Sequence, residues 1–186
     1  MNKLYDKLGI TNRTMKRVSK EKSFNKVKDN IPLVANYNMM CDLLFLPTAK
    51  FGFKYLFVIV DLANDKFDIE PMKNKDANTV LNAMKKCFKR GIITKPEYTL
   101  KSDSGSEFQG VFHKYLYDES ILHKVGLPNR HNSLSNVESL NRQLSRLINT
   151  LCVAKETETG KPFYNWTEFV PIVREELNIF REKNIT

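Results

Sequence analysis

The sequence predicts an α/β domain built on a mixed sheet with helices packed against it. Three strand-like runs follow one another closely between residues 38 and 72, which is typical of an antiparallel meander. Beyond them, helical and strand-like patterns alternate, so that two further strands join the sheet after a helix. At 186 residues the chain is long enough for one domain with its own core.

The first half of the domain is expected to hold the meander and one helix. The first strand is expected at about 38–46, where Asp42 interrupts an otherwise apolar run, and strands over 55–60 and 67–72 follow. Turn residues separate the three runs: Pro47 and Gly52, then Ala63, Asn64 and Asp65. Asp76 is a candidate N-cap for a helix that Gly91 ends, with an apolar stripe at Ala77, Val80, Leu81, Met84 and Phe88.

The second half alternates strands and helices. A strand is expected over 98–102, a helix over 111–117 and a short strand over 122–125. A long helix then follows an apolar stripe at Leu134, Val137, Leu140, Leu144, Leu147, Ile148 and Leu151. A loop over 155–164 separates it from a last helix with apolar positions Trp166, Phe169, Val173, Leu177 and Phe180, of which Trp166 and Phe169 are expected in the core or an interface.

Charge is concentrated at the start of the chain. The net charge is +9, and residues 1–30 hold nine Lys or Arg against three Asp or Glu. Two interpretations stay open: a solvated, partly disordered leader, or a segment that contacts a polyanion. Within it, residues 4–18 have the spacing of helix, Gly turn and helix, like part of a helix-turn-helix.

Composition excludes several classes of protein. No apolar run approaches the roughly 20 residues that a membrane span needs, and no signal-peptide pattern is present. Three scattered cysteines, Cys41, Cys87 and Cys152, indicate buried thiols in a reducing, intracellular compartment rather than disulfides. Neither the cysteines nor His113, His123 and His131 have zinc-site spacing.

Three carboxylates in different settings are the candidate site. Asp42 lies inside an apolar strand, where a bare carboxylate is costly unless something positive compensates it. Asp103 ends the strand over 98–102, and Glu138 lies near the start of the long helix. A strand, a strand end and a helix can bring these groups together only in the folded chain, and converging carboxylates suit a divalent cation.

These residues carry a resemblance to a known family. The segments Met40-Cys41-Asp42-Leu43, Lys101-Ser102-Asp103-Ser104-Gly105-Ser106-Glu107-Phe108 and Ser135-Asn136-Val137-Glu138-Ser139-Leu140-Asn141-Arg142 resemble the DDE catalytic core of retroviral-type integrases. The 34 residues between Asp103 and Glu138 are close to the usual spacing of that family. The resemblance implies an RNase H-like fold with a five-stranded mixed sheet.

The residues of these motifs look most like those of the integrases of Maverick/Polinton elements and virophages. Two features depart from the retroviral pattern: the N-terminal zinc module and C-terminal DNA-binding domain are missing, and Glu107 replaces an Asn. We therefore expect a basic linker over 1–31, with or without part of an upstream helix-turn-helix, and an integrase catalytic core over 32–186.

The resemblance implies a DNA integrase core that removes nucleotides from DNA ends and joins the 3′ ends to target DNA. It assigns Asp42, Asp103 and Glu138 as catalytic ligands of Mg²⁺ or Mn²⁺ in a two-metal site that DNA completes. It also implies a dimer or higher oligomer located in a host nucleus or a virus particle. A nuclease that does not join strands and a catalytically retired DNA-binding or oligomerising module remain alternatives.

Each candidate residue also has a simpler interpretation. Asp103 can serve its turn, Ser135 and Glu138 can form a capping box, and Asp61 can serve a turn rather than support the site. Glu107 is a further acid near the site. Polar residues that repeat along the long helix or precede it can be a solvated surface or, as the resemblance implies, contact DNA: Arg130, His131, Asn132, Asn141, Arg142, Ser145 and Arg146.

Overall fold

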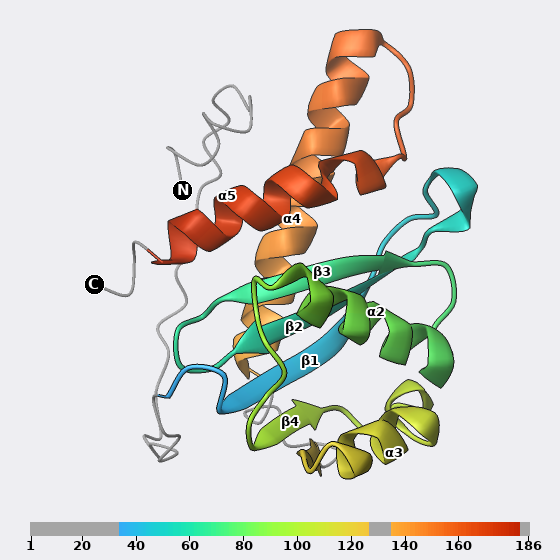
Figure 1. The fold of residues 1–186 in the computed structure, drawn as a ribbon. Coiled ribbons are helices and arrows are strands. Elements are labelled where there is room, and N and C mark those ends of the chain that lie inside the picture. The colour runs from blue at the N-terminus through green and yellow to red at the C-terminus, as the bar shows by residue number, and fades with distance from the viewer. Residues whose placement is uncertain (1–33, 127–134, 183–186) are drawn as a thin grey trace, which may run out of the picture.

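The computed structural model describes residues 34–126 and 135–182. Five strands form one sheet in the order β3-β2-β1-β4-β5 (Figure 1). Their bounds are Asn38–Phe45 (β1), Tyr55–Asp61 (β2), Phe67–Met72 (β3), Thr99–Ser102 (β4) and Leu122–Val125 (β5). β1, β2 and β3 pair antiparallel, whereas β4 runs parallel to both β1 and β5. The predicted five-stranded mixed sheet is confirmed.

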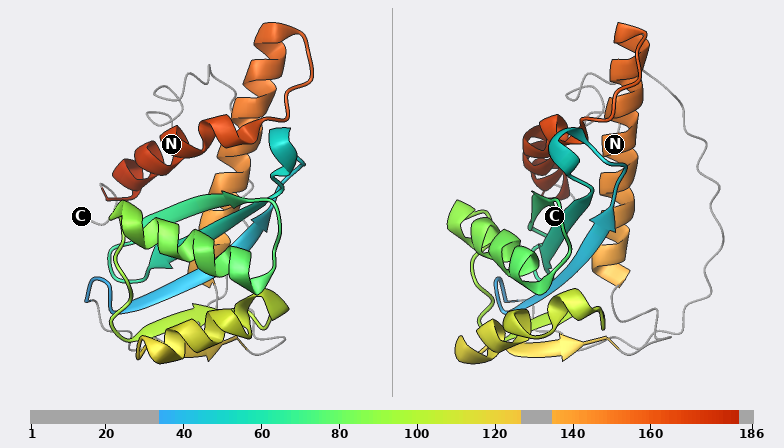
Figure 2. Two further views of the ribbon diagram at one scale, coloured as in Figure 1. Left: turned by 45° about the vertical axis from the view of Figure 1, so that its right-hand side comes forward. Right: turned by 90° about the vertical axis from the view of Figure 1, so that its right-hand side faces the viewer.

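Helices cover both faces of this sheet. The main ones are Ala77–Arg90 (α2), Val111–Asp118 (α3), Ser135–Thr159 (α4) and Val170–Glu182 (α5). Figure 2 shows α2 and α3 on one face and α4 on the other, while α5 runs beside β3 at one edge. None of the helices in the described part of the chain is long and apolar enough to cross a membrane.

Alternation along β1 determines which side chains meet which helices. Met39, Cys41 and Leu43 belong to the core cluster that includes α2 and α3. Met40 and the partly buried Leu44 belong instead to the cluster that α4 and α5 cover. Because successive side chains of a strand point to opposite faces, Asp42 lies on the α4 face between Met40 and Leu44. The strand therefore directs the Asp42 carboxylate toward α4.

Most predicted helix boundaries agree with the structure. Asp76 caps α2 by accepting a hydrogen bond from the Thr79 backbone N–H at 3.0 Å, and Gly91 ends the helix with φ of 80°. The predicted end of α4 was wrong, because this helix continues through Lys155 to Thr159. Its apolar stripe stops at Leu151, but residues with good helix propensity continue the helix until Gly160, at φ of 65°, ends it.

The core side of α4 holds the residues that the sequence predicts for it. Val137, Leu140, Leu144, Leu147, Ile148 and Leu151 are all buried in one cluster. Trp166 is also buried there, and its indole Nε1 donates a hydrogen bond to the Pro47 carbonyl at 2.7 Å. This bond ties the β1–β2 connection to the segment that precedes α5.

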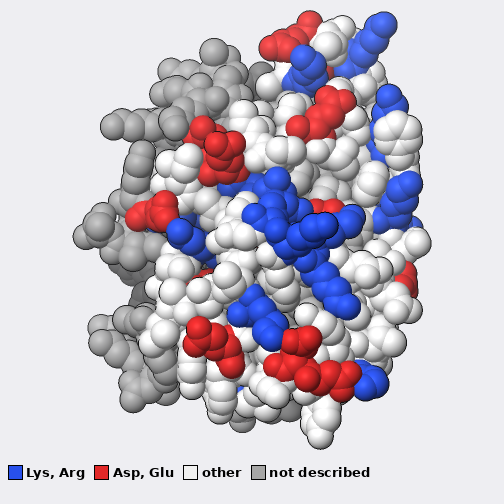
Figure 3. Space-filling view, viewed as in Figure 1, with Lys and Arg blue, Asp and Glu red and all other residues white. Residues whose placement is uncertain are grey.

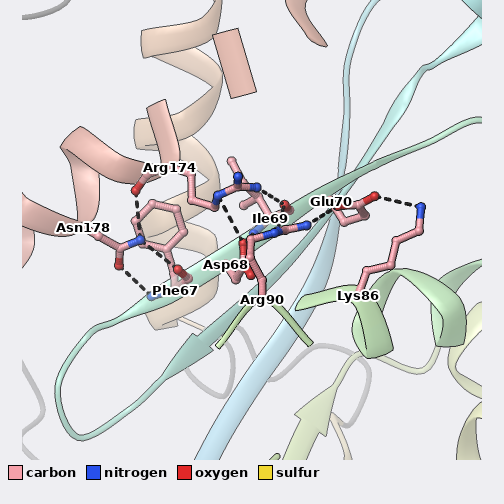
Figure 4. A network of polar contacts seen from close by, with 8 residues as sticks. All are labelled: Phe67, Asp68, Ile69, Glu70, Lys86, Arg90, Arg174 and Asn178. Carbon is pink, nitrogen blue, oxygen red and sulfur yellow. Dashed lines mark hydrogen bonds and ion pairs between the residues drawn. The ribbon is translucent and has the colours of Figure 1, made fainter. Parts of the chain in front are cut away.

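Side chains from α2 and α5 occupy the outer edge of β3 (Figure 4). The Asn178 amide donates to the Phe67 carbonyl at 2.9 Å and accepts from the Phe67 N–H at 3.0 Å. Arg90 and Arg174 donate to the Ile69 carbonyl at 3.2 and 3.3 Å. Backbone groups that an edge strand would leave open to another chain are thereby paired within the protein.

A network of charged groups accompanies this edge. Asp68 has no exposed surface, and its Oδ1 accepts from Arg90 at 2.6 Å and lies 3.6 Å from Arg174 Nε. Glu70 pairs with Arg90 and, at 3.0 Å, with Lys86. Burial raises the pKa of Asp68, and the Arg90 guanidinium opposes that rise. The two arginines therefore partly offset the cost of burying this carboxylate.

Candidate functional site

Asp42 is held at the centre of β1 by two hydrogen bonds. Its Oδ1 accepts from the Leu43 backbone N–H at 2.8 Å, and its Oδ2 accepts from the Asn141 side-chain amide of α4 at 2.8 Å. Both donors are neutral. Throughout the described residues, no Lys or Arg forms an ion pair with this half-buried carboxylate.

The shift in the pKa of Asp42 identifies the charged groups that lie near it. Burial raises the pKa of Asp42 from 3.8 to about 6, although the hydrogen bond from Leu43 opposes the rise. The charges of Asp103, Glu138 and Glu107 each add to it. Three acidic side chains, from the turn after β4 and the start of α4, therefore lie within electrostatic range of Asp42 on β1. Such a cluster has a deficit of positive charge.

Asp103 follows the last residue of β4 and orders the turn behind it. One carboxylate oxygen accepts from the Gly105 backbone N–H at 3.0 Å, which is the turn role that the sequence allowed. Met40 pairs with Lys101 in the parallel ladder, so continuing that register places Asp103 beside Asp42. The turn bond orients one carboxylate oxygen of Asp103 toward Gly105.

Glu107 is the buried member of the cluster. It retains 8% of its surface, on the short 3-10 turn Ser106–Phe108 (η2). A Cβ at Gly105 would lie 2.7 Å from the Glu107 carboxylate, so residue 105 must be Gly for this arrangement. The sequence marked Glu107 only as an additional acid, and the structure places it among the site carboxylates.

Glu138 lies in the first turn of α4, where its side chain is exposed. One turn further on, Asn141 donates to Asp42, and its own Oδ1 is buried without a partner among the described residues. Arg142 and Arg146 are exposed and Ser145 is partly buried on the same helix. The predicted DNA-contact residues Arg130, His131 and Asn132, and the side chain of Ser135, lie outside the described residues.

A polar chain behind Asp103 was not anticipated from the sequence. The Ser102 hydroxyl donates to the Asp103 carbonyl at 2.8 Å and lies 2.9 Å from His123 Nε2. His123 Nδ1 in turn lies 2.9 Å from His113 Nδ1. Burial and the neighbouring His113 lower the pKa of His123 to about 4, so the His123 imidazole is neutral at pH 7. No motif spacing signals this contact, because it depends on the pairing of β4 with β5.

Asp61 serves the turn rather than the site. Its carboxylate is buried and accepts from the backbone N–H groups of Asn36, at 2.7 Å, and Ala63, at 2.9 Å. Both bonds close loops at the end of β2. The simpler of the two interpretations of Asp61 is therefore correct.

The oxygen atoms around Asp42 have the chemistry of ligands for a hard metal ion. Carboxylate oxygens are the ligands that Mg²⁺ prefers, and the excess negative charge around Asp42 favours a cation. Asn141 Oδ1 adds a buried oxygen that lacks a partner in the described part of the chain. Within residues 34–126 and 135–182, however, no three Asp, Glu, His or Cys side chains are gathered closely enough to hold an ion. The chemistry of the residues fits a hard cation, and the spacing of their carboxylates is wider than a closed site requires.

Comparisons with known proteins agree with this architecture. The family model described as the integrase core domain matches residues 34–131, which include Asp42 and Asp103 and stop before Glu138. A search of curated proteins gave no match.

Several solved structures share the fold. The HTLV-2 integrase catalytic core domain in complex with magnesium, in its trimeric form, has a TM-score of 0.54 at 19% identity, over 66% of this chain and 75% of that chain. Its dimeric form gives the same TM-score and identity over 66% and 76%. An intasome of simian T-cell lymphotropic virus in complex with PP2A regulatory subunit B56 gamma gives 0.55 at 18% identity, over 67% and 49%. The predicted RNase H-like fold is confirmed.

Proposed function

The chain belongs to the integrase core domain family, and from that premise we propose that it carries out metal-dependent 3′-end processing and strand transfer. Its substrate in this proposal is the DNA of a mobile element or virus, which it joins to target DNA. The reaction class is polynucleotidyl transfer at phosphodiester bonds, with water or a 3′-hydroxyl as the nucleophile. Asp42, Asp103 and Glu138 are the proposed catalytic residues.

The observation that carries the proposal is the setting of Asp42. Within residues 34–126 and 135–182, this carboxylate on an otherwise apolar strand accepts hydrogen bonds from neutral donors, while three further carboxylates raise its pKa. This arrangement destabilises the folded protein when it is ionised, so a purely structural role does not account for it. A site that takes up a cation with its substrate does account for it.

Asp42, Asp103 and Glu138 would hold Mg²⁺ or Mn²⁺. Ions held there would supply activation of the attacking oxygen and stabilisation of the leaving oxygen in an in-line displacement. Mg²⁺ is usually bound by a few carboxylates together with substrate phosphates. Binding of DNA is therefore the proposed event that draws the separated carboxylates into a closed site.

The remaining residues hold the carboxylates in position or meet the DNA. Asn141 and the Leu43 backbone N–H fix both oxygens of Asp42, and Gly105 N–H fixes one oxygen of Asp103. Arg142 and Arg146 are exposed on the helix that carries Glu138, where they can contact phosphates. We propose that Arg130, His131, Asn132, Asn141 and Ser145 complete the DNA surface.

The function is tested by incubating the full chain with duplex oligonucleotides that end in the terminal sequence of its own element, in Mn²⁺. We expect shortened 3′ ends and products longer than the substrate, which only strand joining yields. Shortened ends without joined products would indicate the alternative nuclease. Absence of both products, together with no metal binding in the presence of DNA, would indicate a catalytically retired module.

We also propose a narrower origin and assembly. The sequence motifs are most similar to Maverick/Polinton and virophage integrases, and the chain would act in a host nucleus or virus particle. The similar HTLV-2 structures are described as dimeric and trimeric forms, which supports a proposal of self-association here. Sedimentation of the protein with and without end DNA tests it.

Replacing Glu138 by Gln separates a catalytic role from a capping role. Gln can still bond back to the Ser135 backbone N–H, so we expect the free energy of unfolding to fall by less than about 1 kcal/mol. A metal ligand needs the charge, so cleavage and joining should be abolished. Thermal melting and the end-joining assay measure the two effects, and retained activity would reduce Glu138 to a helix cap.

The basic leader, which lies outside the described residues, should contribute affinity rather than chemistry. Deleting residues 1–30 should weaken DNA binding and flatten its dependence on salt, by about 0.9 in the log–log slope for each phosphate that the leader neutralises. Titrations at several salt concentrations, on element-end and unrelated duplexes, measure this. Equal slopes would make the leader a solvated linker, and weakening confined to element ends would make it a sequence reader.

A further inference from the structure

A second surface with features of a nucleic-acid contact lies away from the carboxylates. Four lysine amines lie over four aromatic rings, at 5.2 to 5.6 Å from the ring centres: Lys50 over Phe51, Lys54 over Tyr55, Lys73 over Phe53 and Lys75 over Phe45. These eight residues, here termed the lysine–aromatic surface, come from the β1–β2 hairpin and the segment after β3. Residues 43–60 and 71–75 contain no Asp or Glu. The eight residues therefore combine aromatic rings with positively charged side chains, and Glu70 and Asp76 are the acids that adjoin them in the described chain.

Hydrogen bonds within the β1–β2 hairpin and one bond to the core hold this surface in place. Leu46 N–H donates to the Lys54 carbonyl at 3.0 Å, and Ala49 N–H donates to the Phe53 carbonyl at 2.7 Å. The bond from Trp166 to Pro47 anchors the same loop to the core. In Figure 1 the hairpin projects beyond the sheet, and in Figure 3 blue Lys and Arg side chains alternate with white surface along that edge.

Phe51 at the tip is unfavourable for folding in two ways. Its φ is 63°, a left-handed conformation that bulky residues rarely adopt, and its side chain is 72% exposed. Asn or Gly would fit this backbone at lower cost, and either would avoid placing an apolar ring in water. Backbone strain of this kind concentrates at functional positions. The ring at residue 51 therefore serves something other than the stability of the hairpin.

Lysines stacked on aromatic rings can also simply cover apolar surface. That explanation fails for the two outermost rings, since Phe51 remains 72% exposed and Phe45 60% exposed with their lysines in place. Both rings keep exposed surface that a further planar group can contact, and Phe45 is also held edge-to-face by Tyr55 at 5.2 Å between ring centres. The lysine amines beside them supply the positive charge that a phosphate backbone needs.

The surface begins close to the carboxylates. Phe45 lies three residues after Asp42 on β1, which corresponds to about 10 Å along a strand. By the alternation of β1, Phe45 lies on the α2 face and Asp42 on the α4 face, so a DNA strand that contacts both passes around this end of the sheet. β1 and β4 run parallel, so the hairpin projects from the end of the sheet at which Asp103 follows β4. The surface also borders an open pocket of about 350 Å³, lined by Phe53 and Lys73 with the first turns of α2.

We propose that the lysine–aromatic surface binds an unpaired DNA strand that leads to or from the carboxylate site. This inference rests on the proposed integrase function and extends it to the form of the substrate. Bases stack on the exposed rings of Phe51 and Phe45 while the lysines contact the phosphates on either side. Paired bases hide their faces inside the duplex, so the rings engage DNA only where the strands have separated.

The test is to replace Phe51 by Asn in the full chain and to measure binding with metal chelated, so that no reaction occurs. The probes are a labelled thymidine oligomer of about 15 nucleotides and a blunt duplex of the same length. Removing the ring under one stacked base should weaken binding of the single strand about tenfold and leave the duplex unaffected. Because Asn tolerates a positive φ, the melting temperature should not fall.

Tyr164 provides the matched control, since it is 60% exposed in a loop outside the surface. Tyr164→Asn should bind both probes as the unaltered chain does. Replacing both Lys50 and Lys54 by Gln should lower the salt slope on the single strand by about 0.7 for each phosphate that these lysines neutralise. Equal weakening on both probes with Phe51→Asn, or no weakening on either, would overturn the proposal.

The two proposals fail in different ways. Because binding is measured without metal, the Phe51 result stands whether or not the chain processes and joins DNA ends. If the chain joins ends normally and Phe51→Asn binds the single strand unchanged, only the role of this surface is wrong. If the chain does not cleave or join but Phe51→Asn selectively weakens binding of the single strand, the surface is correct and the catalytic assignment is wrong.

Discussion

Replacing Asp42 or Asp103 by Asn is expected to abolish DNA cleavage and joining while leaving the fold intact. Each change removes a proposed metal ligand and keeps the size of the side chain. Removing a group that only supports a metal ligand typically costs 10–100-fold, so removing a ligand itself should exceed about 100-fold. The end-joining assay in Mn²⁺ measures the effect, and either variant retaining activity above a trace contradicts the assignment.

The same Asp42→Asn variant should be more stable than the unaltered chain at neutral pH. The pKa of Asp42 is raised from 3.8 to about 6, so the folded state holds the proton more tightly than the unfolded state does. The resulting contribution to stability is present below about pH 4 and disappears as the pH rises through about 6. A shift of this size corresponds to at most about 3 kcal/mol, and we expect about 1–2 kcal/mol because Asp42 still reaches water.

The hydrogen-bond partners of Asp42 support the direction of this effect. After a rotation of the Asn141 amide, its unpaired Oδ1 can accept from the new amide at residue 42. Chemical denaturation in EDTA at pH 4 and pH 7 would measure the gain, which should appear only at the higher pH. Asp118→Asn is a matched control, because its exposed pair with Lys114 contributes little. A gain of equal size at both pH values would contradict the explanation from carboxylate repulsion.

Among the substitutions considered for this protein, Arg90→Met is expected to cause the largest decrease in the free energy of unfolding. The fully buried Asp68 would lose its 2.6 Å bond to Arg90 and keep the Ile69 backbone N–H, at 2.7 Å, and Arg174, at 3.6 Å. Breaking a buried pair by removing one partner costs about 3–5 kcal/mol, because the other charge stays buried. Since burial already raises the pKa of Asp68, the decrease should be smaller in acid, where this carboxylate takes up a proton.

Two further variants separate this explanation from a general effect of removing a charge. Lys86→Met removes a more exposed partner of Glu70 and should cost less than about 1 kcal/mol. The double variant Asp68→Asn/Arg90→Met should recover much of the stability, since it removes the fully buried carboxylate together with its closest charged partner. Denaturant unfolding measures all three, and equal effects for Arg90→Met and Lys86→Met would show that burial of Asp68 is not the cause.

The spacing of apolar residues predicted most of the fold, because it matches the geometry of the strand or helix in which those residues are buried. Alternation along β1 and the apolar stripe of α4 each have a single way to bury their residues, so both were placed correctly. The end of α4 was missed because the apolar stripe stops at Leu151, while contacts between side chains and the following loop continue the helix: Glu156 accepts from the Phe163 N–H and Lys155 pairs with Glu158. Asp42 was recognisable because a carboxylate breaks an apolar run. The bond from Asn141, the burial of Glu107 and the Ser102–His123–His113 chain depend on contacts between elements, which no local pattern encodes.

The pairing of the β3 edge with side chains from α2 and α5 has a consequence for folding during synthesis. The residue that pairs with both backbone groups of Phe67 is Asn178, which lies 111 positions later in the chain. Because translation proceeds from the N-terminus, the β1–β3 meander can form well before that cover exists. During this interval, neighbouring nascent chains can add strands to the open edge. A polypeptide released before residue 170 would keep that edge permanently, so premature termination should yield aggregates rather than a soluble, smaller domain.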